Sequence, residues 1–208
     1  MEKKAKEFDS IARNIFKPIY PIIAGQIIAR TGITSGTCLD IGCGSGYLGA
    51  ALAKATQLYM HFLDQSPDMI EIVKQTIQEN NIQGRSATIT GDVSSIALPD
   101  NSINLAVSRG SVFFWEDLPQ AFREIYRILA PGGWSYIGGG FGNRELKESI
   151  KGKMMSNENS NGQFGDLMRR NMSPETRERF ETALKTAGIN SYSILHNEDI
   201  GLWIVMRK

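Results

Sequence analysis

The sequence predicts an α/β fold with a doubly wound, mostly parallel sheet of seven strands and an antiparallel hairpin at one edge. From residue 36 onward, short apolar runs alternate with amphipathic segments of helical period. This alternation is typical of parallel strands joined by crossover helices that cover both faces of a sheet. The last two apolar runs are separated only by a short polar turn, which is typical of a hairpin.

The chain before residue 36 is predicted to be helical rather than stranded. Residues 8–16 are expected to form a short helix, and Pro18 is placed to open a longer one that carries isoleucines at helical spacing. We therefore expect residues 1–35 to form an N-terminal helical cover.

Seven apolar runs are predicted to be strands. Five of them belong to the parallel part of the sheet, and they are residues 37–41, 57–63, 86–91, 103–108 and 134–139. The other two, residues 191–196 and 201–208, form the expected edge hairpin.

Three helices have recognisable first residues. Ser66 is followed by a proline and an acid, so a helix should begin there and run to about Asn80. Asp117 can cap a second helix, which Pro131 and the glycines after it would stop. Ser173, again followed by a proline and an acid, can cap a third.

Residues 141–171 form a polar stretch that is too long for a simple connection in a compact domain. We expect a functional lid, and the alternative is a solvated insertion of no special role. The glycines at 138–140 precede this stretch. Their lack of side chains would let a substrate approach, or would provide a hinge for the insertion.

The composition bounds the class of protein. The 208 residues suffice for one domain with a full core, and a formal net charge of +1 gives no overall attraction to nucleic acid or to a membrane surface. No apolar run is long enough to span a bilayer, and the charged start of the chain does not resemble a signal peptide. We expect a cytoplasmic protein with neither partner.

Cys38 and Cys43 are the two cysteines of the chain. One falls in an apolar strand and the other in a glycine-rich loop, so neither a disulfide framework nor a four-ligand zinc site is indicated. No metal site is expected.

The stretch CLDIGCGSGYLG, residues 38–49, has two possible registers. Read from Gly44, it matches the G-x-G-x-x-G of a dinucleotide-binding loop. In that fold the first glycine directly follows the strand, and here that residue is Gly42, which places Tyr47 where the third glycine belongs. The sequence therefore favours a G-x-G-x-G loop that ends at Gly46.

Three acids follow three successive strands. Asp40 would repel a pyrophosphate and attract an ammonium or sulfonium group, because no Lys or Arg lies between residues 38 and 52. Its alternative role is a structural cap on the amides of the loop. Asp64 is placed to accept the hydroxyls of a ribose, and Asp92 to accept from an adenine amine.

Four segments resemble the successive motifs of class I S-adenosylmethionine-dependent methyltransferases: CLDIGCGSG, FLDQSPDMI, TGDVSSIALPDNSINLAVSR and FREIYRILAPGGWSYIGG. The likeness covers about residues 36–139 and implies a Rossmann-like methyltransferase fold. It implies one domain over residues 1–208, with 36–140 as the cofactor-binding core, 141–172 as the lid insertion, and 173–208 as a C-terminal helix and edge hairpin.

The resemblance also implies that S-adenosylmethionine binds across the strand ends and leaves as S-adenosylhomocysteine. Asp64 would then bind the ribose, Asp92 the adenine, and Ser108 would face the methyl group. The implied cofactor residues are Asp40, Gly42, Cys43, Gly44, Gly46, Asp64, Gln65, Met69, Gly91, Asp92, Val93 and Ser108.

The acceptor is expected to be a small molecule. The segment SRGSVFFWED lacks the N-P-P-Y-like pattern that accompanies methylation of nucleobase or glutamine amino groups. Arg109 could bind an anionic group of the acceptor, or it could form a surface salt bridge. No catalytic base is evident, and the candidate substrate residues are Tyr20, Arg109, Trp115, Gly140, Asn143 and Arg144.

Two rival functions stay open from the sequence. One is an NAD-dependent oxidoreductase, against which the register of the glycines and Asp40 both count. The other is a non-catalytic protein that binds S-adenosylmethionine without transferring its methyl group.

Overall fold

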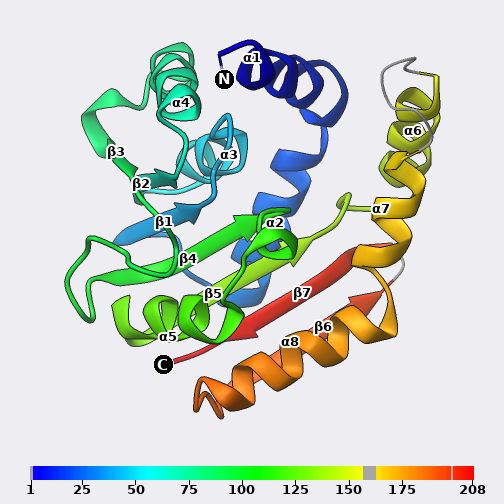
Figure 1. Ribbon diagram of the computed structural model, residues 1–208. Helices are drawn as coiled ribbons and strands as arrows, with labels where there is room; N and C mark the ends of the chain where they lie inside the picture. Colours follow the sequence, from blue (N-terminus) through cyan, green and yellow to red (C-terminus); the bar gives the residue numbers. More distant parts are fainter. Residues whose placement is uncertain (1, 157–162, 198) are drawn as a thin grey trace.

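The computed structural model describes residues 2–156, 163–197 and 199–208, and it shows a seven-stranded sheet between two layers of helices (Figure 1). The strand order is β3-β2-β1-β4-β5-β7-β6. The strands are β1 (Thr37–Ile41), β2 (Tyr59–Asp64), β3 (Ser86–Thr90), β4 (Ile103–Arg109), β5 (Leu129–Gly139), β6 (Tyr192–Asn197) and β7 (Gly201–Met206).

The helices alternate with the strands in the central part of the chain. The longer ones are α1 (Glu2–Ile11), α2 (Ile19–Thr31), α3 (Tyr47–Ala55), α4 (Pro67–Glu79), α5 (Leu118–Ile128), α6 (Arg144–Met155), α7 (Gln163–Asn171) and α8 (Pro174–Thr186). The short turns are η1 (Ala12–Phe16), η2 (Gln83–Arg85) and η3 (Val112–Phe114), of which η1 is π-helical.

The predicted fold class is confirmed. Strands β1 to β5 pair in parallel, whereas β7 lies antiparallel between β5 and β6. The order reverses at β1, which has β2 on one side and β4 on the other. In doubly wound sheets this switch point is where a crevice opens outside the carboxyl ends of the strands.

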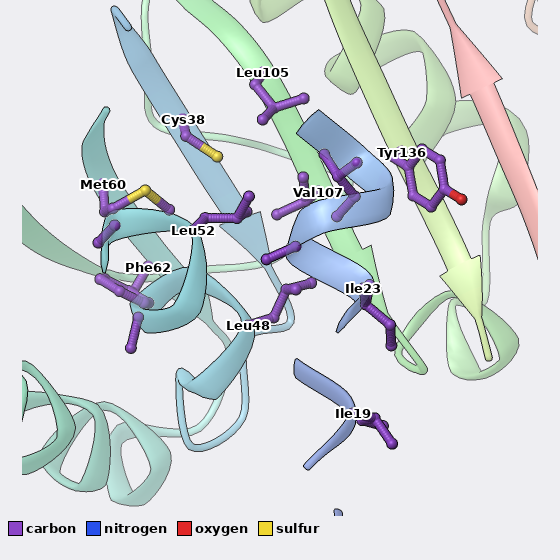
Figure 2. Packing of buried hydrophobic residues seen from close by; sticks show 14 of the residues in the cluster. Ile19, Ile23, Cys38, Leu48, Leu52, Met60, Phe62, Leu105, Val107 and Tyr136 are labelled. Atoms are coloured by element: carbon purple, nitrogen blue, oxygen red, sulfur yellow. The ribbon is translucent and has the colours of Figure 1, made fainter. Parts of the chain in front are cut away.

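Alternate residues of β1 enter two separate hydrophobic cores. Cys38 belongs to the core beneath α2, α3 and α4, whereas Leu39 and Ile41 belong to the core beneath α5 and α8. This division follows from the period of two along a strand. Figure 2 shows the first core, where Ile23 of α2 and Leu52 of α3 lie against the strand side chains.

The three predicted helix starts are confirmed by their caps. The Ser66 hydroxyl accepts from the Met69 N–H at 3.3 Å, and the Ser173 hydroxyl accepts from the Thr176 N–H at the same distance. The carboxylate of Asp117 caps α5 in the same way. Each side chain satisfies an amide that the first turn of a helix leaves without a partner.

The boundary between α5 and β5 differs from the prediction. Helix α5 ends at Ile128, and β5 begins at Leu129, well before residue 134. Leu129 is already extended and pairs with Ile103, so the strand continues through Pro131 and the two glycines after it. The proline is tolerated because the strand is irregular there, with a register shift opposite residues 103–105.

The N-terminal and insertion segments are more helical than expected. The first helix begins at Glu2 rather than residue 8, and Pro18 precedes α2 as predicted. Residues 141–172 contain α6 and α7, which were not predicted as helices. Both lie on the same side of the molecule as η1 (Figure 1), and Phe16 contacts Phe164 at a ring separation of 6.2 Å. Among the described helices, none is both long and apolar enough to cross a bilayer.

Candidate functional site

A cavity of about 790 Å³ lies at the carboxyl ends of the parallel strands. This volume is near the upper end of the roughly 300–1,000 Å³ typical of small-molecule pockets. Its wall combines three parts of the chain: the loops after β1 to β5, the N-terminal segment from α1 to α2, and the insertion around α7. Twelve of the eighteen predicted site residues line it: Tyr20, Gly42, Gly44, Asp64, Gln65, Met69, Gly91, Asp92, Val93, Arg109, Trp115 and Gly140.

The loop after β1 is built on glycines with left-handed backbone. Gly42, Gly44 and Gly46 have φ angles of 58°, 53° and 76°, a region that other residues rarely adopt. A Cβ atom on Gly42 would lie 2.5 Å from the side chain of Ser111, and one on Gly44 would lie 2.9 Å from the ring of Phe8. The loop therefore has no room for a side chain at Gly42 or Gly44, and its backbone forms an open cradle.

Asp40 does not face the cavity. It is 2% exposed, and its Oδ2 atom accepts a hydrogen bond of 2.8 Å from the N–H of Gly49. Burial raises the pKa of Asp40 to about 7, against the opposing effect of the Gly49 N–H. The expectation that Asp40 attracts the cationic part of a ligand is corrected, because the carboxylate is buried and acts as a structural cap. The amide that it caps belongs to α3, whereas the alternative from the sequence placed the cap on the amides of the loop.

Gly49 is a residue of α3 and not part of the ligand loop. A Cβ atom there would collide with the ring of Phe62 and lie 2.9 Å from the carboxylate of Asp40. The glycine is thus required by the close approach of α3 to β1 and β2. This confirms the register in which the loop ends at Gly46, the residue before α3.

Asp64 is placed at the end of β2 with its carboxylate on the cavity wall. Its Oδ2 atom accepts from the Gly44 N–H at 2.9 Å, and its Oδ1 atom accepts from the Ser66 N–H at 3.0 Å. One carboxylate therefore links the glycine loop to the start of α4. Each oxygen keeps acceptor capacity for a further donor, and Gln65 and Met69 line the cavity beside it.

The loop after β3 contributes Gly91, Asp92 and Val93 to the wall. The carboxylate of Asp92 turns toward Ser94, accepting from its N–H at 2.7 Å and lying 2.5 Å from its hydroxyl. These two hydrogen bonds lower the pKa of Asp92. The side chain is exposed at the rim of the cavity, where a ligand could reach it.

Arg109 ends β4 on the other side of the switch point from Asp64. Its guanidinium carbon lies 4.8 Å from the ring centre of Phe16 and 5.7 Å from that of Phe141. Burial lowers the pKa of this guanidinium. Burial also raises the pKa of the nearby Tyr20, whereas the charge of Arg109 lowers it.

Two predicted substrate residues lie outside the cavity wall. The side chain of Asn143 caps α6 by accepting from the Leu146 N–H at 2.8 Å. The side chain of Arg144 is 75% exposed, and its Nε atom lies 2.7 Å from a carboxylate oxygen of Asp199. Asn143 therefore acts as the cap of α6, and Arg144 pairs with Asp199 at the surface, away from the cavity wall.

Three predicted cofactor residues also lie outside the wall, besides Asp40. Ser108 is fully buried and does not line the cavity, and its hydroxyl lies 2.6 Å from that of Ser111, which does line it. Cys43 and Gly46 belong to the glycine loop without lining the space above it. Their contribution is the shape of the loop, since the Gly46 N–H donates to the Cys43 carbonyl at 2.8 Å.

The glycines at the end of β5 have a packing role that the sequence did not reveal. Cβ atoms on Gly138 and Gly140 would collide with the backbone carbonyls of Leu202 and Ile200. These glycines let β7 pair closely with β5, which corrects the idea that they clear a path for a substrate. Gly140 still lines the cavity, where its carbonyl accepts from Arg109.

Sequence reasoning missed most of the aromatic wall. The missed residues share an apolar character and come from segments that were read only as cover, loop or insertion. A usable signal was the eight-residue spacing of Phe8 and Phe16, which puts both near one side of a helical segment. The missed lining residues include Phe8, Ile11, Ala12, Phe16, Phe113, Phe114, Phe141, Phe164, Leu167, Met168 and Met172.

No cluster of three or more His, Cys, Asp or Glu side chains suitable for a metal ion occurs within the described parts of the chain.

Comparison with known proteins points to one family. A family model described as "Methyltransferase domain" matches residues 39–137. The crystal structure of a Methanococcus maripaludis protein, described as an S-adenosyl-L-methionine-dependent methyltransferase, is 49% identical with a TM-score of 0.95. The similarity covers 100% of this chain and 93% of that one.

Curated relatives match over shorter stretches. The biotin biosynthesis bifunctional protein BioHC of Teredinibacter turnerae is 31% identical over 62% of this chain and 24% of its own length. A malonyl-[acyl-carrier protein] O-methyltransferase of Serratia marcescens is 32% identical over 46% of this chain and 34% of its own length. The matched part of the chain thus spans about a third or less of each of these two relatives.

The glycine loop, the strand order and the full-length similarity all point to the same family. The antiparallel β7 between β5 and β6, the loop that ends at Gly46 and the similarity over the full chain fit the family whose motifs the sequence resembles. The chain belongs to the class I S-adenosylmethionine-dependent methyltransferases.

Proposed function

We propose that the protein transfers a methyl group from S-adenosylmethionine to a small-molecule acceptor and releases S-adenosylhomocysteine. The observation that supports this most directly is the shared cavity. It places the glycine loop and Asp64 on one side of the switch point, and Arg109 with its aromatic neighbours on the other. A donor and an acceptor would therefore meet above β1 and β4.

The residues on the β1 to β3 side fit the cofactor. Gly42 and Gly44 leave a cradle that a side chain would fill, and loops of this kind before a helix suit a carboxylate. Asp64 has acceptor capacity for ribose hydroxyls, and Gly91 to Val93 lie where an adenine would reach the wall. Asp40 would act indirectly, by fixing the loop to α3.

The cofactor brings the activated methyl group, so the chain mainly has to align the acceptor and exclude water. The aromatic rings of Phe16, Phe141 and Phe164 are suited to the second task, since they contact one another at separations of 6.2–6.4 Å. We propose that residues 2–35 close the cavity as a cover, and that residues 141–156 and 163–172 close it as a lid. Residue 1 and residues 157–162, which belong to the same predicted segments, lie outside the described part of the chain. The core would then be residues 36–140, as the resemblance implies.

The acceptor class and the cellular location belong to the same proposal. The net charge of +1 favours a small molecule over a nucleic acid. The two thiols, Cys38 and Cys43, are unpaired, which fits a reducing cytoplasm.

Calorimetric titration tests the cofactor assignment. We expect S-adenosylmethionine and S-adenosylhomocysteine to bind with one site and NAD to show no heat of binding. Binding of NAD alone would refute the proposal. Transfer of a labelled methyl group to a component of a metabolite extract then separates an enzyme from a non-catalytic binding protein, with heat-denatured protein as the control.

A further inference from the structure

Arg109 is held in the cavity wall by one backbone acceptor. Its Nε and Nη2 atoms donate to the carbonyl of Gly140 at 3.3 and 3.2 Å. The guanidinium also lies over the ring of Phe16. These contacts orient the plane of the group, and they leave the Nη1 atom without an acceptor among the described residues.

The charge of Arg109 has no carboxylate partner within 4.0 Å in the described chain, unlike several other arginines. Arg127 pairs with Glu124 and Asp100, and Arg144 pairs with Asp199, all near the protein surface. An enclosed cation without a counter-ion is unfavourable, because burial removes water that would stabilise the charge. An anionic ligand in the cavity would supply the counter-ion of Arg109.

The surroundings of Arg109 place it at the acceptor side. Its contacts are with Phe16 of η1 and with Phe141 and Gly140 beyond β5. The strand order puts β4 and β5 on the opposite side of β1 from Asp64. The same aromatic residues contact Phe164 of α7, so the guanidinium lies beside an aromatic part of the wall.

We propose that Arg109 binds an anionic oxygen group of the methyl acceptor, a carboxylate or a phosphate ester, while the aromatic wall contacts an apolar body. This inference rests on the proposed function, because it names the acceptor class of the same cavity. The planar guanidinium suits both groups, since each presents two oxygens to its N–H donors. Gly140 is the positioning residue that turns the guanidinium toward the cavity.

The test uses wild-type protein loaded with S-adenosylhomocysteine, and calorimetry with defined probes. Benzoate, 1-naphthoate and octanoate are each compared with the corresponding neutral amide, and phenyl phosphate with phenol. We expect the best anion to bind about tenfold or more tightly than its neutral partner, the scale of hydrogen bonds to a charged group. The carboxylate and phosphate probes show which anionic group the site prefers.

Substitutions at Arg109 test whether this residue causes the preference for anions. Arg109→Met keeps the apolar stem and should remove the preference for anions, whereas Arg109→Lys should keep part of it. Arg123→Met is the matched control, because Arg123 lies on the exposed side of α5 and bonds to Gln120 and the Thr186 carbonyl. It should keep the full preference. The wild-type comparison of anion with amide stands even if an Arg109 variant does not fold.

Three results would overturn the inference: no preference for any anion, the same loss in Arg123→Met, or an Arg109→Met variant that binds S-adenosylhomocysteine weakly and 5′-methylthioadenosine normally. The last would assign Arg109 to the carboxylate of the cofactor. Failure of the proposed function is distinguishable, since wild-type protein would then bind no S-adenosylhomocysteine, while the anion probes, titrated without it, would still report on Arg109.

Discussion

The carboxylate of Asp40 at the end of β1 accepts a 2.8 Å hydrogen bond from the N–H of Gly49 in the first turn of α3. The residue before α3 is Gly46, which has no side chain to cap the helix. Asp40 therefore supplies, from across the loop, the acceptor that the first turn of a helix needs. The glycine loop is fixed at both of its ends by this one contact.

Replacing Asp40 with Asn should change how stability depends on pH. Burial raises the pKa of Asp40 to about 7, whereas in the unfolded chain it is about 3.9. The folded state thus binds a proton that the unfolded state releases, so the free energy of unfolding should fall as pH rises from about 4 to 7. Each pKa unit corresponds to about 1.4 kcal/mol. Asp40→Asn keeps an acceptor for Gly49 without the charge and should flatten this dependence.

Urea denaturation between pH 4 and pH 8 measures the effect. Asp64 is the charged group that also acts on Asp40, so it stays in place in both proteins. Asp100→Asn is the control, because the carboxylate of Asp100 is exposed and paired with Arg127. It should leave the slope near that of the wild type. If the free energy of unfolding changed with pH equally in Asp40→Asn and in the wild type, the pKa of Asp40 would not be raised by folding, and the prediction would be wrong.

Gly49→Ala should destabilise the protein although alanine favours helices. The added methyl group would collide with the ring of Phe62 and crowd the carboxylate of Asp40. Overpacking of this kind costs typically about 1–3 kcal/mol. Gly25→Ala is a matched control, since Gly25 also lies in a helix but has no atom within 4 Å of the added methyl. That variant should be neutral or more stable, by up to about 1 kcal/mol, in the same denaturation assay.

The features that could be predicted from the sequence are those that depend on residues close together in the chain. The period of two in β1, the caps at Ser66 and Asp117, and the register of the glycine loop all depend on neighbouring residues. Each of these predictions needed no knowledge of which distant segments would meet.

The missed features depend on contacts between distant segments. Phe164 reached the cavity because α7 meets Phe16, and a polar insertion gives no signal for such a contact. Ser108 was expected at the cavity, but its buried hydroxyl turns to Ser111, whereas its neighbour Arg109 lines the wall. Arg109 was also predicted and does line the wall, so what the sequence could not reveal is that the Ser108 hydroxyl is buried against the loop that contains Ser111.

Asp64→Ala should weaken the binding of S-adenosylhomocysteine. The variant loses an acceptor for the ribose and also the contacts with Gly44 and Ser66. Hydrogen bonds to a charged group contribute roughly 1.5–3 kcal/mol, so calorimetry should show a loss of at least about tenfold. Asp68→Ala changes the next acid along the chain, which does not line the cavity, and should keep the wild-type affinity. Unchanged affinity in Asp64→Ala would remove Asp64 from the site.

Tyr47→Phe should loosen the N-terminal cover without disturbing the sheet. The Tyr47 hydroxyl of α3 donates to a carboxylate oxygen of Asp9 in α1 at 2.8 Å. Arg13 lies beside Asp9 and pairs with Glu79 of α4 at 3.1 Å, so α1 and η1 are tied to both helices.

Removing one hydrogen bond costs about 0.5–1.5 kcal/mol, which should speed amide exchange in α1 several-fold, as measured by mass spectrometry. Tyr59→Phe is the control, since the side chain of Tyr59 is at the surface, 39% exposed. Faster exchange in β1 and β4 as well as in α1 would mean that Tyr47 stabilises the whole fold instead. Exchange confined to α1 would instead assign the Tyr47–Asp9 contact to holding the cover over the glycine loop, where Phe8 already lies against Gly44.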